Sequence, residues 1–348
     1  MSAGVSRPRL NPALRRLWRD TRTLQLGLDP ARALIIDGVD PAVIRFVLTL
    51  DGRRREPEVL ADGAAAGIDI GELTEILAGL RRGGALLDGP EPELEGRLEP
   101  DRAGLALLPE PPPGPIFALR AECSVVVHGG GRVGMPLAAL LAAAGVGAVD
   151  LVDEDPVNPG ACVPGGFSPA DVRRAARTAA RDVLRRAAPG VRVNARLPHR
   201  LPDLTILATA YPIESDLRSA LQAARLPHLV AGIRETTAIV GPLVLPGRTS
   251  CLQCANLHRA DRDPAWPLLA LQLTGEERRQ VPAADAALAL TAVGIAGSQA
   301  LAFLDGRPTA VREATLELAQ PDWRIRRRRW PHHPRCDCRF GQQMSQAG

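Results

Sequence analysis

The chain has 348 residues, of which 45% are hydrophobic, enough for about two domains with a sizeable buried core. The formal charge is only +4, and all 43 basic residues are arginine because the sequence contains no lysine. Such a small positive excess is typical of a solvated surface, so we expect no nucleic-acid partner. The N-terminus lacks the apolar run of a secretory signal, and the apolar segments 133–149 and 288–304 are shorter than the roughly 20 residues of a membrane span. The sequence therefore predicts a cytoplasmic protein without a membrane partner, in which both segments are buried helices.

Residues 1–92 are predicted to form a small domain of their own. Segments 21–28 and 32–39 alternate as β-strands do and predict a hairpin. Three helices are predicted next, over 41–50, 57–66 and 70–82. The third has four apolar residues at helical spacing before the stop signal at Gly83 and Gly84, namely Leu73, Ile76, Leu77 and Leu80. A hairpin with three short helices indicates a winged-helix-like domain.

A proline-rich stretch, residues 93–118, separates this region from the remainder. Successive prolines hold a chain extended and remove backbone donors, so we expect a linker there. Residues 119–348 then alternate between strand-like and helix-like patterns, which favours an α/β fold with a doubly wound parallel sheet. Near the C-terminus, residues 313–330 predict a hairpin with one arginine-rich face.

A glycine-rich turn follows the first strand of the second region. Gly129, Gly131 and Gly134 match G-x-G-x-x-G between an apolar strand and a helix, where backbone amides and the helix dipole favour a phosphate. Asp153 ends the next strand, where a carboxylate accepts hydrogen bonds from ribose hydroxyls, and Asp155 completes a D-x-D pattern. The pattern fits a nicotinamide enzyme, an ATP-dependent enzyme, or a tight turn that binds nothing.

Two cysteine pairs predict a metal site. Cys251 and Cys254 form C-x-x-C, while Cys336 and Cys338 form C-x-C. Two chelating pairs can close a tetrahedral four-thiolate zinc site, and we expect structural zinc there. A disulfide, disfavoured in a reducing compartment, and free thiols are the alternatives.

Three stretches of the second region resemble the ThiF/MoeB family, the E1-like proteins that adenylate the C-terminus of ubiquitin-like sulfur carriers. They are AAAGVGAVDLVDEDPV (142–157), GPLVLPGRTSCLQC (241–254) and TAVGIAGSQALAFL (291–304). The resemblance covers about residues 119–340. It implies an E1-like Rossmann sheet, an ATP and magnesium site at the glycine turn, a homodimer, and two C-x-x-C pairs, of which the second is shortened here.

The resemblance also exposes what this chain lacks. In the family an Asn-x-x-Arg segment follows D-x-D, a lysine opens the next helix, and an aspartate ends the fourth strand to hold the metal. The corresponding positions here are Ala161, Pro164, Ala176 or Arg177, and 208–212, and Arg132 replaces a glycine of the loop. Adenylation crowds negative charge that Mg²⁺ and cations must offset, so we assign no catalytic residue. Arg173, Arg174 and Arg177 are the candidates to replace the lysine, although arginine is not equivalent to it.

Other reactive side chains lie near these motifs. Cys123 is expected to be inert, and Cys162 is either a nucleophile or, as we favour, a structural residue. His332 and His333 are alternative zinc ligands or exposed residues. His258, Arg259, Asp261 and Asp263 form either a functional cluster with His258 as proton carrier or, as we favour, a cap for the following helix.

The hairpin and three-helix domain, joined to an E1-like region with the segment LHRADRDPAWPLLALQL (257–273) and a C-x-C pair, resembles the leader-peptide-binding, E1-like partners of cyclodehydratases in azole-modified peptide pathways. In that group the front domain is PqqD-like and captures a peptide as an added strand at a sheet edge. The resemblance implies a degenerate scaffold that presents a leader peptide to a YcaO-type or other modifying enzyme. The alternatives are an active ATP-dependent adenylyltransferase of a ubiquitin-like or peptide C-terminus and, with less support, a nicotinamide dehydrogenase.

Overall fold

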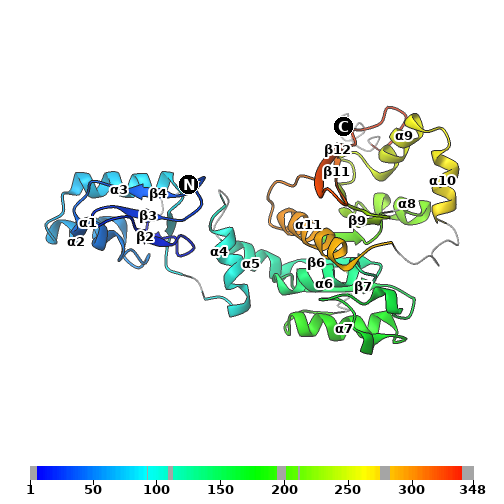
Figure 1. Ribbon diagram of the computed structural model, residues 1–348, viewed down its shortest axis with the longest axis horizontal. Coiled ribbons are helices and arrows are strands. Elements are labelled where there is room, and N and C mark those ends of the chain that lie inside the picture. Colours follow the sequence, from blue (N-terminus) through cyan, green and yellow to red (C-terminus); the bar gives the residue numbers. More distant parts are fainter. Residues whose placement is uncertain are drawn as a thin grey trace, which may run out of the picture. The chain divides into compact units, whose positions relative to one another are not determined.

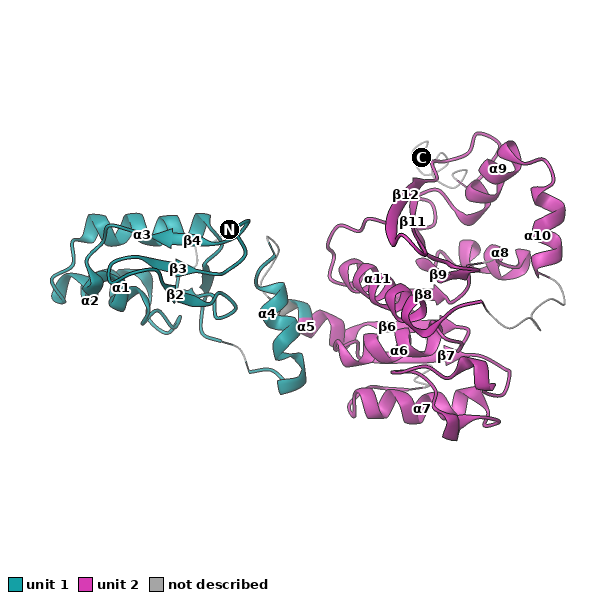
Figure 2. Cartoon of the chain, viewed as in Figure 1, with its two compact units in different colours: residues 1–116 teal, residues 117–348 magenta. Residues whose placement is uncertain are grey.

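The structure, a computed structural model, describes residues 6–91, 93–108, 113–193, 201–210, 212–274 and 283–338. The chain divides into two compact units, residues 1–116 and 117–348 (Figure 2). Each unit has a buried apolar core of its own.

The first unit combines short strands with helices (Figure 1). Its elements are β1 (Pro8–Leu10), β2 (Arg16–Trp18), β3 (Leu24–Leu26), β4 (Leu34–Ile36), α1 (Pro41–Val47), α2 (Glu56–Ala65), α3 (Ile70–Arg82), β5 (Leu86–Asp88), η1 (Gly96–Leu98), α4 (Glu99–Leu105) and the first part of α5 (Pro113–Glu122). β1 pairs antiparallel with β5, and β2, β3 and β4 form an antiparallel sheet in that order. The expected hairpin and three helices are confirmed, and β2 adds a strand that the sequence did not predict.

Helix α3 shows why the sequence pattern predicted this unit well. The Asp69 side chain accepts a hydrogen bond from the Glu72 N–H and so caps the helix start. Leu73, Leu77 and Leu80 are buried in the core, while Ile76 is half-buried beside it. The helix ends at Gly83 and Gly84, the latter with φ +70°, a conformation that glycine adopts at little cost.

The expectation of an extended linker over 93–118 is wrong for its described residues, which form η1, α4 and the start of α5. Pro100 lies in the first turn of α4, where a helix needs no N–H donor, so proline there is compatible with a helix. The segment is also attached to the first unit, since the Asn11 Nδ2–H donates to the Ala106 carbonyl over 2.7 Å. Residues 109–112 lie outside the described residues.

The second unit contains a seven-stranded sheet. Its elements are the rest of α5, β6 (Ser124–His128), α6 (Gly134–Ala143), β7 (Ala148–Val152), η2 (Pro159–Ala161), η3 (Pro169–Asp171), α7 (Ala176–Ala187), β8 (Leu204–Leu207), α8 (Ser215–Ala223), β9 (His228–Arg234), β10 (Thr237–Val244), α9 (Leu252–Arg262), α10 (Trp266–Thr274), α11 (Ala286–Leu304), β11 (Ala314–Ala319) and β12 (Arg324–Arg329). The strand order is β12-β11-β10-β9-β8-β6-β7. β7, β6, β8 and β9 are parallel, and the pairs from β9 to β12 are antiparallel. The predicted α/β class and the C-terminal hairpin are confirmed, and the sheet is mixed rather than parallel throughout.

Alternating side chains divide the sheet into two buried faces. Leu204 and Ile206 of β8 belong to the large core that includes residues of α6, α7 and α11. Leu207 of β8 and Val230 of β9 belong instead to a smaller cluster with residues of α8 and α9. This alternation follows from the two-residue period of a strand. Three of the four paired cysteines lie in the smaller cluster, so that cluster joins α9 to the C-terminal segment.

Among the described residues one helix, α11, is long and apolar enough to cross a membrane, and half of it is buried. It packs against β9, β10 and α6, and Gly297 lies so close to Leu140 of α6 that a Cβ there would approach it to 2.6 Å. These contacts are those of a core helix, as expected for this segment. Helix α6 is buried along nearly all of its length, also as expected.

Candidate functional site

The glycine-rich turn lies at the carboxyl end of β6, where residues 129–134 and Asp153 form what we call the glycine-loop site. Gly129 has φ +93°, a backbone conformation that favours glycine. A Cβ on Gly134 would lie 1.8 Å from the Gly129 carbonyl oxygen, so the start of α6 packs directly on the loop. A Cβ on Gly131 would meet nothing within 4 Å. Gly129 is therefore favoured by its backbone conformation and Gly134 is required by packing, whereas Gly131 faces open space.

The Asp153 carboxylate binds the loop itself. Its Oδ2 accepts a hydrogen bond from the Gly130 N–H over 2.6 Å, and its Oδ1 accepts one from the Asp155 N–H over 3.1 Å. Asp155 is exposed beside it. Both predicted acids thus lie next to the glycines, and the structure brings all five predicted nucleotide-binding residues together. Contacts of these residues with a ribose or phosphate stay predictions.

The family resemblance aligns an asparagine with Ala161, an arginine with Pro164 and a lysine with Ala176 or Arg177. Ala161 and Ala176 are buried alanines, and Pro164 is exposed on the surface. Arg132 is half-buried, and its Nη1–H donates to the Gly160 carbonyl over 3.1 Å. The Arg132 Nε is buried without a partner among the described residues. Arg132 is therefore fixed to backbone beside the loop.

The arginines that follow in sequence do not compensate in this arrangement. The Arg174 guanidinium lies between two carboxylates, at 2.6 Å from Asp171 and 2.5 Å from Asp182. Arg173, with φ +70°, and Arg177 are exposed. Sequence reasoning named these arginines and missed the two aspartates, because their ion pairs depend on how η3 packs against α7. At the end of β8, Ala208 lies against the loop and donates its N–H to the His128 carbonyl, and Tyr211 lies outside the described residues.

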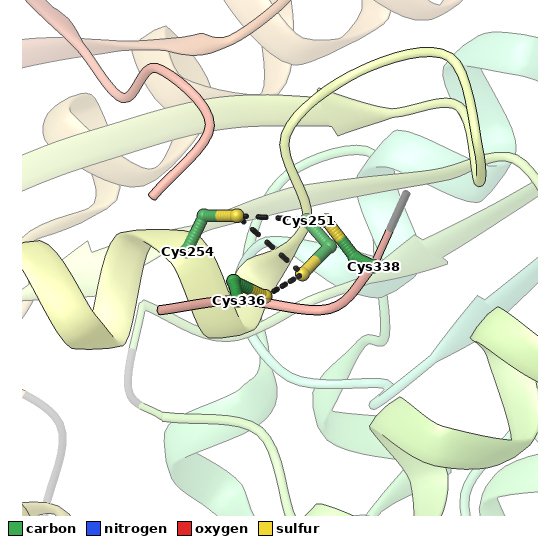
Figure 3. Close-up of side chains that lie close together, drawn as sticks. All are labelled: Cys251, Cys254, Cys336 and Cys338. Atoms are coloured by element: carbon green, nitrogen blue, oxygen red, sulfur yellow. Dashed lines mark hydrogen bonds between the residues drawn. The ribbon is translucent and has the colours of Figure 1, made fainter. Parts of the chain in front are cut away.

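The four predicted cysteines gather into one cluster from α9 and the C-terminal segment (Figure 3). Figure 3 shows their sulfur atoms turned toward one another. The Sγ atoms of Cys251 and Cys254 are 3.9 Å apart, those of Cys251 and Cys336 3.7 Å, and those of Cys254 and Cys338 3.6 Å. All four lie within 4.8 Å of one another, and none forms a disulfide.

These separations suit zinc. A tetrahedral ion with bonds of about 2.3 Å to sulfur requires sulfur atoms about 3.8 Å apart. The hydrogen bond from Cys251 lowers the pKa of Cys254 to about 4, while the same contact raises the pKa of Cys251. The shortened C-x-C pair therefore does not prevent four sulfurs from converging.

The neighbouring histidines brace the cluster. The buried His333 donates from Nε2 to Asp261 over 2.7 Å, and its Nδ1 accepts the Arg335 N–H over 3.1 Å. His258 Nε2 lies 3.0 Å from the Pro331 carbonyl oxygen. Ligand atoms of His258, Asp261 and His333 lie within 4.8 Å of one another, yet both nitrogens of His333 are engaged.

The remaining predicted residues have structural contacts. Asp263 ends α9, and its Oδ1 accepts a hydrogen bond from the Ala265 N–H over 3.0 Å in the turn before α10. Cys162 is half-buried, and its sulfur lies 4.0 Å from the Asn158 carbonyl oxygen. Cys123, also half-buried, lies 3.2 Å from the Leu119 carbonyl oxygen. His332 is half-buried rather than exposed.

An E1-like sheet with a glycine loop after its first strand and a four-cysteine cluster defines the class of this unit. Residues 118–340 match the ThiF family, and the chain belongs to that family. The chain has the fold of MccB from E. coli, crystallised with ATP, with a TM-score of 0.73 and 16% identity over 95% of this chain and 99% of that one. The MccB complex with N-formylated MccA gives a TM-score of 0.72 at 15% identity over the same shares, and PaaA gives 0.67 at 20% over 92% and 99%. A comparison with curated protein sequences gives no match.

Proposed function

We propose that this chain is a catalytically degenerate ThiF-family scaffold, which binds a leader peptide and presents it to a separate modifying enzyme in the biosynthesis of a ribosomally made peptide. One observation carries the proposal: the glycine-loop site keeps its backbone geometry, while the positions aligned with the family's asparagine and arginine hold Ala161 and Pro164, and the lysine position falls on Ala176 or the exposed Arg177.

Forming an acyl-adenylate brings a carboxylate against the α-phosphate of ATP, and cations with Mg²⁺ must offset that charge. Of the nearby arginines, Arg174 is neutralised by Asp171 and Asp182, and Arg132 is held by the Gly160 carbonyl. Asp153, the acid expected to bind ribose, already accepts two N–H groups of its own loop. Since the chain has no lysine, no compact ammonium group is available to replace them.

Peptide binding is supported by the structural neighbours. MccB has been crystallised with the peptide MccA, and its fold matches this chain over 95% of its length, which includes the first unit. We propose that the first unit, predicted as residues 1–92, is the PqqD-like recognition element, with 93–118 as connection and 119–348 as the ThiF domain.

The edge strand β4 is the place where we propose that the leader peptide adds a strand. β4 ends the β2-β3-β4 sheet, so one of its sides carries no strand among the described residues. It lies beside α3, because a Cβ on Gly83 would approach Leu34 to 2.4 Å. Half-buried Leu34, Ile36 and Ile76 border this edge, and Ile35 is 52% exposed. Backbone hydrogen bonds at such an edge give affinity, and the apolar side chains give specificity.

The other parts of the proposal follow from the family resemblance and the cysteine geometry. We propose that Cys251, Cys254, Cys336 and Cys338 hold structural zinc, which would lock α9 to the C-terminal segment. We further propose a cytoplasmic homodimer whose partner is a YcaO-type or other modifying enzyme.

An active adenylyltransferase of a ubiquitin-like protein or a peptide C-terminus is the second candidate. It is favoured by the similarity to MccB crystallised with ATP. In that case exposed Arg173 or Arg177 would move to the phosphates, with ATP and Mg²⁺ at Gly129, Gly131, Gly134, Asp153 and Asp155. A nicotinamide dehydrogenase has no support beyond the loop and Asp153.

The two candidates are separated by ATP–pyrophosphate exchange. The zinc-loaded full chain is assayed with MgATP and a candidate peptide, chosen by a prior search for a short peptide gene beside its own gene, in parallel with the variant Asp153→Ala. We expect both proteins to show the same background exchange, because neither supplies the missing charges. Exchange by the wild type that disappears in Asp153→Ala would establish the adenylyltransferase instead.

Peptide capture by β4 is tested with the same peptide carrying fluorescein, by fluorescence anisotropy. Ile76→Glu places a charge beside the strand edge and is expected to weaken binding about 10-fold or more, as burying an unpaired carboxylate costs more than 1.4 kcal/mol. Ile70→Glu, the same change at an exposed position of α3, is the control and is expected to bind like the wild type. Equal affinities of the two variants, with melting temperatures unchanged, would remove the proposed groove.

A further inference from the structure

A pocket lies on the α8 and α9 face of the sheet, away from the glycine loop. It is open to solvent, and its water-accessible volume is about 40 Å³. Its walls come from the segment after β8, from α8, β9 and β10, and from α9 and α10. Three arginines line it, one each from α8, β9 and α9: Arg218, Arg234 and Arg259. We call it the arginine pocket.

The positive charge of the arginine pocket is not neutralised from within. Among its described lining residues none is acidic. The other polar groups of the lining are the Asn256 amide, whose Oδ1 accepts a hydrogen bond from Arg259 over 3.3 Å, and the Trp266 Nε1–H. Neither Arg218 nor Arg234 forms an ion pair with any described residue. Glu317 is the acid whose charge acts on Arg259, and it already pairs with Arg328 over 2.8 Å. The pocket therefore has a net positive charge that an anionic ligand would offset.

Arg259 is held ready for such a ligand. Its guanidinium carbon lies 4.5 Å from the ring centre of the buried Trp330 and 5.3 Å from that of Trp266. These rings fix the guanidinium plane by cation–π contacts. Desolvation, and after it repulsion from Arg234, lowers the pKa of Arg259 to about 10. A half-buried cation beside a like charge is unfavourable for stability, which is typical of a residue kept for binding.

The remaining lining determines the kind of anion. Pro212, Ile213, Val230, Ile239 and Pro242 make much of the wall apolar. A carboxylate on a short aliphatic stem fits both the apolar wall and the arginines of the pocket. Its methylenes contact the wall while its oxygens face the guanidinium groups. A triphosphate has no apolar stem for this wall.

The position of the pocket connects it to the rest of the site. Arg234 ends β9 and Pro212 follows β8, and both strands run parallel within the sheet that contains β6, so both residues lie toward the carboxyl edge of the sheet, where the glycine loop also begins. Leu252 and Ala255, which line the pocket, lie on α9 next to Cys251 and Cys254. Zinc at the cysteines would thus fix one wall of the pocket.

From this arrangement we infer that the arginine pocket binds a carboxylate of the peptide that the chain handles, with Arg234 and Arg259 as its specificity-determining residues. The inference rests on the proposed peptide-binding function and adds the chemistry of the bound residue. The carboxylate comes either from an acidic side chain or from the peptide C-terminus.

Binding of four small probes to the zinc-loaded full chain tests the inference by saturation-transfer NMR titration. N-acetyl-L-glutamic acid α-amide carries only a side-chain carboxylate, N-acetyl-L-alanine only a terminal one, N-acetyl-L-alaninamide none, and tripolyphosphate is the phosphate probe. We expect at least one carboxylate probe to bind with a millimolar Kd, and the one that binds more tightly identifies the source. The neutral amide is expected not to bind.

Arg234→Gln is expected to weaken the binding of that probe about 10-fold or more, since one charge-assisted contact is lost. Arg326→Gln, at an exposed position of β12, is the matched control and is expected to bind like the wild type. Arg218→Gln serves as the second variant should Arg234→Gln melt below the wild type.

The inference is overturned when neither carboxylate binds, when Arg234→Gln and Arg218→Gln keep full affinity, or when tripolyphosphate binds in a way that Arg234→Gln abolishes. Loss of carboxylate binding with intact capture of the fluorescent peptide rejects only the pocket. Carboxylate binding that persists while the fluorescent peptide is not captured rejects only the leader-peptide role of the first unit.

Discussion

The glycine-loop site and the arginine pocket lie on one sheet, but they differ in which feature of an anion site they have. The loop has the backbone shape, and the pocket has the positive charge. The loop has the backbone turn and helix start that bind phosphate, while Ala161 and Ala176 stand where charged or polar groups are required. The pocket has three arginines without an acid among its described lining residues, but no glycine turn. The backbone shape that binds phosphate and the positive charge that would offset it thus lie at two different places. We interpret this as a fold that was retained while the chemistry of nucleotide activation was lost.

The largest effect is expected from removing a cysteine, because the cluster holds α9 and so a wall of the arginine pocket. Cys251→Ser is expected to lose bound zinc and to lower the melting temperature by about 10 °C or more, as structural zinc contributes on the order of 10 kcal/mol. Metal content and thermal melting measure this. Cys162→Ser, the control, is expected to keep both values, and a Cys251→Ser protein that melts like the wild type would show that the cluster is not a structural metal site.

A smaller loss of stability is expected when one of two arginines is replaced, and its size depends on whether that arginine pairs with a carboxylate. Arg120 is buried and donates to both oxygens of Asp305, over 2.7 and 2.8 Å. Arg120→Met leaves that carboxylate with Arg307 alone, and we expect a loss of about 3 kcal/mol in the free energy of unfolding.

Arg259→Met makes the same change where no carboxylate pairs with the guanidinium. We expect its free energy of unfolding to lie within about 1 kcal/mol of the wild type or above it, since a poorly compensated charge is removed at the cost of cation–π contacts. Urea denaturation gives both values. Equal destabilisation of the two variants would mean that Arg259 is a structural residue rather than one kept for a ligand.

A small effect, between those of Arg120→Met and Arg259→Met, is expected at the glycine loop. Asp153→Ala removes the acceptor of the Gly130 and Asp155 N–H groups, and we expect a loss of about 1–2 kcal/mol in the free energy of unfolding. Binding of the carboxylate probes is expected to stay unchanged, as measured by the same NMR titration. A parallel loss of probe binding would show that the loop and the pocket act as one site.

Local patterns predicted most of the elements and the metal cluster. The cap at Asp69, the spacing of the leucines and the stop at Gly83 predict helix α3. The spacing of the four cysteines is enough to predict the metal cluster. The linker prediction failed because prolines in the first turn of a helix do not break it, as at Pro100.

The arginine pocket could not be predicted from the sequence. Its three arginines lie 16 and 25 positions apart, on two helices and a strand, within a chain where every basic residue is arginine. Only the folded sheet brings them together, and only the absence of an acid among the described lining residues distinguishes them from surface arginines. Similarly, the sequence showed that Arg174 was available but not that Asp171 and Asp182 neutralise it.

The central claim is that the glycine-loop site keeps its backbone shape without the charges that bind a nucleotide. Its most direct test is a crystal structure of the zinc-loaded full chain grown with Mg²⁺ and a non-hydrolysable ATP analogue. We predict that the glycine-loop site will show neither an ordered triphosphate nor a bound Mg²⁺ ion. A triphosphate ordered at Gly129–Gly134, with Mg²⁺ beside it and Arg132, Arg173 or Arg177 contacting its oxygens, would contradict the scaffold proposal.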